Sequence, residues 1–448
     1  MSFLIGIIGL SVMVLIHEFG HFLAARMFGV EVLKFSVGMG PKLYGRKIGK
    51  TEYLISALPL GGYCQMKGEE DFVKAMELKA KKIDGSEGSL YGIAPWKRMV
   101  IAFAGPFFNL VSAMLLFVII NLSGYTIETT DNRLILASDF TGKADMPADA
   151  AGLQTGDRIT AVNGQPTEYF YQIMEAAALH AGEELTLSVD RHGDLLTVNV
   201  TPQLNPKTGA GVIGIFSFQP AEIDKVRTGS PAYEAGLRPG DVIIQINGSP
   251  IAHSLDLQKA LSAPQAGGKA AVTVSRDGDL QTLTLFFDPN EKRSPGFSLK
   301  TLRIPSERLP FAKAVAGGIA EPFSIIVQQI KSFAVLNQVD LNSALQGPVR
   351  ITAMIGDSVL YSFGLSIKDG FMYTFRIIAV ISVILFFMNL LPIPALDGGL
   401  ILISLIETVI RRPLPPKALS IYQTVGVFVI ILLSILVLTN EFIFYARQ

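Results

Sequence analysis

Four long apolar stretches constrain the fold of this 448-residue chain more than any other feature. They cover residues 3–25, 99–122, 377–396 and 418–438. Each has roughly the ~20 apolar residues that a helix needs to cross the hydrocarbon core of a bilayer. Charged residues make up only 17% of the chain, against about 25% in a typical soluble domain. We therefore expect a multi-pass α-helical membrane protein with four transmembrane helices.

Basic residues beside these stretches indicate which helix ends face the cytoplasm. Arg26, Lys34 and Lys42 follow the first stretch, Lys97 and Arg98 precede the second, and Arg411, Arg412 and Lys417 lie between the third and the fourth. Loops rich in Lys and Arg tend to remain cytoplasmic. Both termini and the long segment 124–367 are therefore expected on the opposite side. Lys plus Arg equals Asp plus Glu at 38 each, so no net positive charge suggests binding to nucleic acid.

The long external segment contains an internal duplication. Residues 147–164 read PADAAGLQTGDRITAVNG and residues 231–248 read PAYEAGLRPGDVIIQING, with 10 of 18 positions identical. Each copy predicts a short helix, a turn and a strand that ends at an Asn-Gly hairpin turn, and arginines 191 and 276 begin a later hairpin in each. The pattern resembles two tandem PDZ domains, expected over residues 124–221 and 222–305. Such domains bind extended peptides at a sheet edge, whereas a β-rich spacer without a ligand is the alternative.

The first apolar stretch contains the motif HExxH, as His17-Glu18-Phe19-Gly20-His21. A spacing of four places both imidazoles on one face of a helix, where they can share a tetrahedral metal ion. The Glu18 carboxylate then stands beside the water that such an ion activates. A pair of membrane histidines satisfied by neighbouring helices is the alternative. It is disfavoured because ionisable groups within a span are costly and rarely persist without a function.

Two histidines leave a catalytic zinc ion one protein ligand short, because such sites use three protein ligands and an open position. The single cysteine, Cys64, excludes a multi-cysteine cluster, and we assign it to packing. The remaining histidines, His180, His192 and His253, all lie in the external repeat. Asp397 is the strongest acidic candidate within the membrane region. Pro392 and Pro394 break the helix before it, and Gly398-Gly399 allow the close backbone packing of a segment that lines a polar cavity.

Several motifs together resemble the site-2 protease family of intramembrane zinc metalloproteases, in its bacterial form. They are HEFGH at 17–21, FSVGMGP at 35–41, PLGGY at 59–63, GPFFN at 105–109, the tandem PDZ pair, and NLLPIPALDGG at 389–399. The resemblance covers nearly the whole chain. It implies Zn²⁺ as the cofactor, with His17, His21 and Asp397 as its ligands. It also implies that Glu18 is the catalytic residue and that the Asn389 amide contacts substrate.

Residues 34–66 combine alternating apolar residues with turn-forming glycines and predict membrane-associated β-hairpins, as the family resemblance also implies. We expect an exposed edge strand there to pair with an unwound substrate beside the metal. The residues assigned to this substrate-binding role are Gly38, Gly40, Tyr53, Leu54 and Ile55. An ordinary cytosolic hairpin is the alternative.

The chain is accordingly divided into nine segments. Residues 1–25 form the first transmembrane helix with HExxH, 26–97 the cytoplasmic-side hairpins and loop, 98–123 the second transmembrane helix, and 124–221 and 222–305 the two PDZ domains. Residues 306–375 form an external amphipathic helix, interrupted at Gly317-Gly318 and Pro322, and a connecting segment. Residues 376–400 form the third transmembrane helix with the Leu-Asp-Gly motif, 401–417 a cytoplasmic loop, and 418–448 the fourth transmembrane helix and the C-terminus.

The sequence thus predicts a zinc-dependent endopeptidase of the bacterial inner membrane that cleaves single-span proteins, with its active site toward the cytoplasm and its PDZ domains and termini in the periplasm. The resemblance implies trimmed anti-sigma factors and remnant signal peptides as substrates, in regulated intramembrane proteolysis and a stress response. A PDZ scaffold with a vestigial metal site is one alternative, but a structural ion needs no Glu18. A transporter is another, but four spans without an inverted repeat argue against it.

Overall fold

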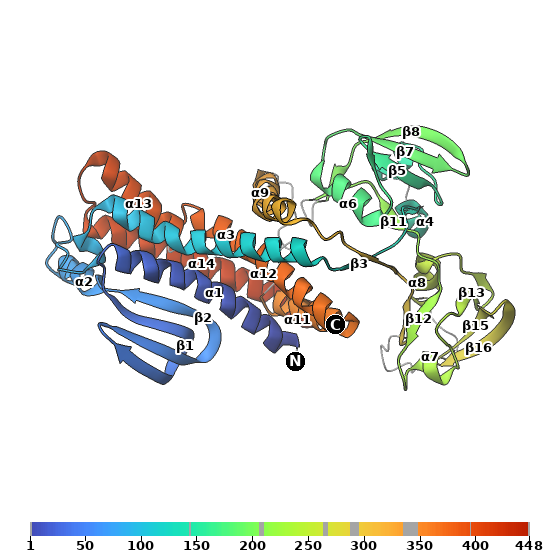
Figure 1. Ribbon diagram of the computed structural model, residues 1–448, viewed down its shortest axis with the longest axis horizontal. Coiled ribbons are helices and arrows are strands. Elements are labelled where there is room, and N and C mark those ends of the chain that lie inside the picture. The colour runs from blue at the N-terminus through green and yellow to red at the C-terminus, as the bar shows by residue number, and fades with distance from the viewer. Residues whose placement is uncertain are drawn as a thin grey trace. The chain divides into compact units, whose positions relative to one another are not determined.

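The computed structural model describes residues 2–142, 145–205, 210–262, 268–286, 295–334, 348–394 and 396–446 (Figure 1). The chain forms two compact units. One comprises Met1–Tyr125 and Ser306–Gln448, and the other comprises Thr126–Pro305. The first unit is mainly helical, whereas the second is built from short strands and short helices.

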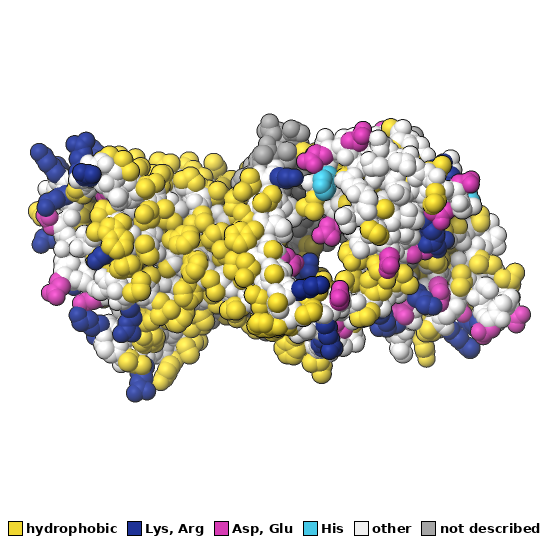
Figure 2. Space-filling model, turned by 45° about the horizontal axis from the view of Figure 1, so that its top comes forward, with side chains coloured by type: hydrophobic (Ala, Val, Ile, Leu, Met, Phe, Trp, Pro, Cys, Tyr) yellow, Lys and Arg dark blue, Asp and Glu magenta, His cyan; other side chains and the backbone are white. Residues whose placement is uncertain are grey.

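Four helices of the first unit are long and apolar enough to span a membrane, as the sequence predicted. They are α1 (Ser2–Met27), α3 (Pro95–Ser123), α12 (Ile367–Leu390) and α14 (Pro416–Ala446). Figure 2 shows an extensive apolar surface over this unit. Lys and Arg side chains gather at the end of the unit where α2 (Glu69–Glu77) and α13 (Asp397–Ile410) lie. The chain is therefore a membrane protein.

The region of the third predicted span differs in its details from the prediction. Helix α12 ends at Leu390, and a separate helix, α13, begins at Asp397. Most of residues 401–417, expected to form a loop, therefore belong to α13. Pro392 and Pro394 lack a backbone N–H and separate the two helices. The segment before α12 contains another helix, α11 (Pro348–Leu365), which packs against α1 and α12.

Helix α3 lies at the centre of the helical unit. It packs against α1, α9 (Phe311–Ala334), α12 and α13. Ala113, Phe117 and Ile120 of α3 are buried together with apolar residues of α12. Glycine permits the closest approach of α1 to α3, because a Cβ on Gly20 would lie 2.4 Å from the carbonyl oxygen of Ala104. Small residues at such crossings bring membrane helices into backbone contact.

Helix α9 corresponds to the predicted amphipathic helix, but it is continuous through Gly317, Gly318 and Pro322. The expected interruption is therefore wrong. A Cβ on Gly318 would lie 2.7 Å from the backbone nitrogen of Val118 in α3. Close packing of α9 on α3 explains this glycine.

The β-structure of the first unit is one two-stranded sheet of long, irregular strands, β1 (Val32–Ile48) and β2 (Thr51–Met66). Residues 34–37 pair with residues 62–65 on one side and with residues 52–55 on the other. Residues 62–66 consequently form one edge of the sheet. This end of β2 lies along α1, where Ser11 Oγ contacts the carbonyl oxygen of Pro59 and the N–H of Gly61.

The second unit consists of two lobes with similar folds. Each contains a four-stranded antiparallel sheet, in the orders β6-β5-β7-β8 and β14-β13-β15-β16. The first lobe contains β4 (Leu134–Leu136), α4 (Ala137–Thr141), α5 (Pro147–Ala150), β5 (Arg158–Val162), β6 (Gln165–Pro166), α6 (Phe170–Leu179), β7 (Leu185–Arg191), β8 (Asp194–Val200), β9 (Gln203–Leu204), β10 (Gly211–Val212) and β11 (Ile215–Ser217). The second contains β12 (Ile223–Val226), α7 (Pro231–Glu234), β13 (Val242–Ile246), β14 (Ser249–Pro250), α8 (Ser254–Ser262), β15 (Lys269–Arg276), β16 (Asp279–Phe286) and β17 (Phe297–Leu299). Strand β3 (Thr126–Thr129) pairs with β18 (Leu302–Pro305), so the two ends of the unit lie side by side.

The duplicated sequence forms the same polar contacts in both lobes. Asn163 and Asn247 each adopt a φ of 49° at the predicted hairpin turns. Asp157 accepts hydrogen bonds from Nε and Nη2 of Arg191 at 2.8 and 2.7 Å. Asp241 accepts the equivalent bonds from Arg276 at 2.7 and 2.8 Å. In each lobe the arginine of the later hairpin therefore forms an ion pair with the aspartate of the Gly-Asp turn in the same repeat.

Candidate metal centre and active site

Helix α1 presents His17 and His21 on the face that packs against α3. Their Nε2 atoms lie 3.1 Å apart, and the two residues are only 8% and 7% exposed. The helical spacing of four residues accounts for this geometry. Two buried imidazole nitrogens at this distance can be bridged by a shared cation.

Asp397, the first residue of α13, completes a group of three. Its Oδ2 lies 3.0 Å from Nε2 of His17, and its Oδ1 lies 3.3 Å from Nε2 of His21. The chain packs tightly here, because a Cβ on Gly398 would lie 2.1 Å from the carbonyl oxygen of Leu391 and one on Gly399 would lie 2.6 Å from that of Ile393. The two glycines allow the close backbone packing that the sequence predicted.

The three side chains fit a zinc ion. Tetrahedral ligands at about 2.0–2.1 Å from zinc lie about 3.3 Å from one another, and the three separations here are 3.1, 3.0 and 3.3 Å. Two imidazole nitrogens and a carboxylate oxygen are a donor set used by catalytic zinc sites, which keep a further position open. Among the described residues, this is the only group of three or more His, Cys, Asp or Glu side chains with such close donor atoms.

Glu18 lines the same cavity as the three donors. The cavity has a volume of about 410 Å³ and is also lined by Asn389, at the end of α12, and by Cys64 of β2. The backbone N–H of Cys64 faces the Glu18 carboxylate. One cavity therefore combines a metal-binding group, a carboxylate that can transfer a proton, and an amide that can bind a peptide.

The Cys64 thiol does not belong to the group of close donor atoms. Burial raises the pKa of its thiol to about 12, and the nearby Glu18 carboxylate contributes in the same direction. The packing role expected from the sequence remains the simplest assignment.

The hairpin residues expected to bind substrate do not lie on the edge that borders this cavity. Tyr53, Leu54 and Ile55 pair with residues 35–37 on one side and with residues 44–46 on the other, so a substrate strand cannot pair with them. Gly38 and Gly40 adopt φ values of 87° and 85°, which favour glycine. In the described part of the chain, no strand pairs with the outer side of residues 62–66. This edge includes Cys64 and Met66, which line the cavity.

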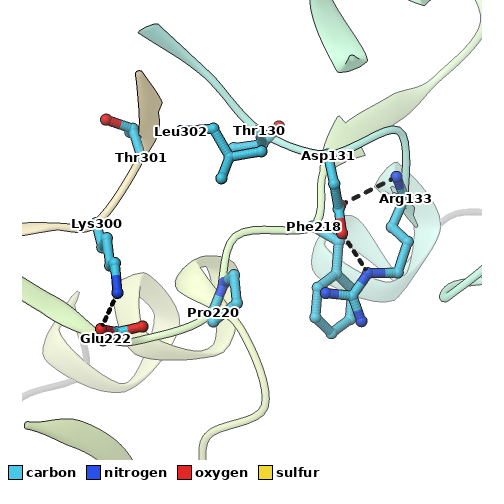
Figure 3. Close-up of a pocket in the computed structure, with 9 residues that line it drawn as sticks. All are labelled: Thr130, Asp131, Arg133, Phe218, Pro220, Glu222, Lys300, Thr301 and Leu302. Atoms are coloured by element: carbon cyan, nitrogen blue, oxygen red, sulfur yellow. Dashed lines mark hydrogen bonds and ion pairs between the residues drawn. The ribbon is translucent and has the colours of Figure 1, made fainter. Parts of the chain in front are cut away.

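A further cavity, of about 240 Å³, lies in the second unit between segments of its two lobes (Figure 3). Its charged side chains are paired with each other. Nε of Arg133 lies 3.0 Å from Oδ2 of Asp131, and Lys300 pairs with Glu222. The Arg133 guanidinium also lies over the ring of Phe218, at 4.3 Å from its centre. These contacts neutralise the charges of the cavity and indicate a structural role.

Three contacts of α3 with the histidines were not identified from the sequence. The carbonyl oxygen of Ile101 lies 2.8 Å from Nδ1 of His21, and the Asn109 side chain lies 3.2 Å from Nδ1 of His17. Gly105 lies against the His21 ring, where a Cβ would come within 2.3 Å of Nε2. Gly105 and Asn109 both belong to the GPFFN motif, four positions apart. This spacing is the sequence feature that could have identified their contacts with the histidines.

Sequence comparisons agree with the chemistry of this centre. The profile of "Peptidase family M50" matches residues 5–433. A protein of Treponema pallidum (strain Nichols) that is named as a zinc metalloprotease is 37% identical over 441 residues, covering 98% of both chains. A protein of Vibrio cholerae serotype O1 with the same designation is 31% identical over 462 residues, again covering 98% of both. "Regulator of sigma E protease" of Haemophilus influenzae is 28% identical over 453 residues, covering 98% of this chain and 97% of the relative.

Proposed function

The chain belongs to peptidase family M50, the site-2 protease family, and is a zinc-dependent metalloendopeptidase; from this premise we propose that it cleaves single-span membrane proteins within the membrane. The observation that carries the proposal is the meeting of His17, His21 and Asp397 in a helical unit with four apolar helices. A site among such helices suits a substrate that is itself a membrane helix.

In the proposed mechanism His17, His21 and Asp397 would hold the zinc ion, which would act as a Lewis acid toward the water and the scissile carbonyl. Glu18 accepts a proton from the attacking water as the new C–O bond forms. It then passes this proton to the amide nitrogen as the C–N bond breaks. The products are one carboxyl terminus and one amino terminus.

Substrate binding is assigned to the edge of β2 at residues 62–66. A transmembrane helix shields its peptide bonds with its own hydrogen bonds, so the substrate must unwind before cleavage. A sheet edge offers replacement hydrogen bonds to an extended segment by strand addition. The proximity of this edge to Glu18 supports this assignment. Asn389 lines the same cavity, and its amide can both donate and accept hydrogen bonds.

The two lobes of the second unit are assigned as tandem PDZ domains in the periplasm. Their repeated folds and the basic residues at one end of the helical unit support this orientation in the inner membrane. The name of the Haemophilus relative links that protein to sigma E. For this chain we extend the proposal to trimmed anti-sigma factors and remnant signal peptides, in regulated intramembrane proteolysis during a stress response.

The decisive experiment is cleavage of a model single-span substrate by the purified protein in lipid vesicles. Cleavage should stop when a zinc chelator is added and return when zinc is restored. The Glu18→Gln variant is the control for contaminating proteases, and it should be inactive under all conditions. Cleavage that continues in the zinc-free protein would refute the proposal.

The orientation is tested by thiol labelling in the Cys64→Ala background. The exposed positions Lys81, in the helical unit, and Leu195, in the first lobe, are each replaced by cysteine. In intact spheroplasts an impermeant reagent should label the Leu195→Cys protein and should label the Lys81→Cys protein only after lysis. Labelling of both before lysis would contradict the proposed orientation.

The PDZ domains are proposed to act as a size gate that excludes substrates with bulky folded ectodomains. The alternative is activation by docking of a trimmed tail. A cavity of about 430 Å³ in the second unit supports this alternative, because it is lined by Phe170, Met174 and Ile215 beside the short strand β11.

Deletion of residues 126–305 separates these two accounts. A short linker can replace the unit, because the N–H of Ser306 donates to the carbonyl oxygen of Tyr125 at 2.7 Å. A gate predicts that the deletion protein cleaves untrimmed substrates, with Glu18 still required. Tail docking predicts slower cleavage of trimmed substrates. A zinc-loaded deletion protein that rejects every untrimmed substrate would rule out the gate.

A further inference from the structure

One face of α3 contacts the Nδ1 atoms of His17 and His21, which are the ring nitrogens that do not face Asp397. Ile101 and Asn109 are about two helical turns apart, with Gly105 between them. Ile101 contacts Nδ1 of His21 through its carbonyl oxygen, and Asn109 contacts Nδ1 of His17 through its amide. Gly105 leaves the space that the His21 ring occupies. This face of α3 therefore supports the group on the side opposite Asp397.

The contact with Ile101 determines the tautomer of His21. A neutral imidazole carries a proton on one nitrogen and a lone pair on the other, and the lone pair binds a metal. A carbonyl oxygen can only accept a hydrogen bond, so Nδ1 of His21 donates to Ile101. The lone pair of His21 then lies on Nε2, the atom that faces His17 and Asp397.

His17 needs the same tautomer, because its Nε2 also faces Asp397 and His21. Its Nδ1 must then carry the proton and find an acceptor. The Asn109 amide lies at this position, with its Nδ2 placed 3.2 Å from Nδ1 of His17. Asn109 is 0% exposed, and its Oδ1 has no hydrogen-bond partner in the described part of the chain. The contact with His17 is the hydrogen bond that the described residues provide for this buried amide, and an amide buried without a partner is unfavourable.

The two ends of an amide have nearly the same shape, so an Nδ1–H on His17 requires the amide to be turned, with Oδ1 in the place of Nδ2. We propose that Asn109 is a positioning residue of the metal centre: its Oδ1 accepts the Nδ1–H of His17 and holds the ring with Nε2 ready to bind zinc. The inference rests on the proposed role of His17 as a zinc ligand. Hydrogen-bond partners of ligating histidines of this kind fix the ring and raise its basicity.

The test is the zinc affinity of the purified full-length protein, measured by competition with a chelator. Asn109→Leu has a similar shape but no acceptor, and it should bind zinc about 10–100-fold more weakly. Asn109→Ala should weaken binding similarly, which shows that the leucine effect is not steric. Asn109→Asp keeps an acceptor and should bind nearly as tightly as the unchanged protein. Asn121→Leu is the control, because Asn121 lies on the same helix and contacts α9 instead.

Cobalt substituted for zinc provides a second readout, since its visible absorption depends on ligand geometry. Asn109→Leu should change the spectrum, and Asn109→Asp should restore it. Unchanged affinity and spectrum in Asn109→Leu would overturn the inference, as would an Asn109→Asp protein of intact helical content that binds as weakly as Asn109→Leu. Metal affinities in the expected order, in proteins that cleave no substrate, would instead count against the proposed function alone.

Discussion

The metal centre and the two lobes are assembled in opposite ways. In the lobes, the buried Arg–Asp pairs join residues 34 and 35 positions apart, and the same arrangement occurs twice. In the metal centre, α1 contributes His17, α3 contributes Asn109 at a separation of 92 positions, and α13 contributes Asp397 from near the other end of the chain. This arrangement occurs once among the described residues.

The difference shows how stability and chemistry are distributed in this protein. Each lobe has its own buried core and its own Arg–Asp pair, so damage to one lobe should remain local. The metal centre depends on the packing of several helices, and each of its groups has a separate role. Substitutions should therefore affect the two regions independently.

The largest effect is expected at Glu18. Glu18→Gln should lower the cleavage rate by about 10²–10⁴-fold, because the amide cannot accept a proton from water. Zinc content should remain normal, since Glu18 is not one of the three donors. Both quantities are measured on the same preparation. Glu175→Gln, an exposed change on α6 of the first lobe, is the control and should alter neither the cleavage rate nor the zinc content. Normal turnover by Glu18→Gln would exclude Glu18 as the base.

Loss of a proposed ligand should remove the metal itself. Asp397→Ala and His21→Ala should lose most of the bound zinc during dialysis against a chelator, because two protein ligands hold the ion poorly. His180→Ala is a matched control: Nδ1 of His180 also lies 2.8 Å from a carbonyl oxygen, that of Ala176, but in the first lobe. Mass spectrometry measures the zinc that each variant retains after dialysis. Full zinc retention by Asp397→Ala would remove that residue from the ligand set.

An effect confined to one lobe is expected for Arg276→Met. The Asp241 side chain is only 1% exposed, and removal of its partner leaves a buried charge, which should destabilise the second lobe by about 3 kcal/mol. Hydrogen exchange should accelerate in β13 and β15 but not in β5 and β7. Zinc content should be unchanged. Equal acceleration in both lobes would show that they are not independent. Lys259→Met, an exposed change in the second lobe, is the control and should not alter hydrogen exchange.

The smallest effect is a dependence of the second lobe on acid pH. Burial alone would raise the pKa of Asp241, but hydrogen bonds from Arg276 and from the Arg238 N–H outweigh burial and hold it below its ordinary value of 3.8. The unfolded chain then binds the proton first on acidification. The contribution to stability is complete above about pH 5 and is lost as the pH falls through the lower, folded pKa.

Methyl NMR signals of Ile243 and Ile246, which are buried in this lobe, would report its urea unfolding at pH 6 and pH 3.5. The midpoint should fall at the lower pH. Asp241→Asn should start from a lower midpoint and lose this part of the pH dependence. The same pH dependence in Asp241→Asn would assign the effect to other groups.

Local patterns made much of this fold predictable. Apolar stretches identified four helices that are long and apolar enough to span a membrane, and the Asn-Gly turns of the repeat formed as expected because two-residue hairpins require a positive φ. The HExxH spacing placed His17 and His21 on one face of a helix. Contacts between distant segments were predicted less well. Tyr53, Leu54 and Ile55 were expected at an edge, but the folding of β1 and β2 over each other placed them between two paired segments.

The sequence by itself determined the elements and the donor types of the metal centre, because side-chain periodicity and helix breaking depend on neighbouring residues. Only the tertiary structure determined which β2 edge borders the cavity, why α9 contains Gly318, and which side chain supports His17. These features arise where backbones from separate segments come into contact, as at Gly20 and Ala104. Such a contact leaves no periodic pattern in the sequence of either segment, because it depends on where α1 crosses α3.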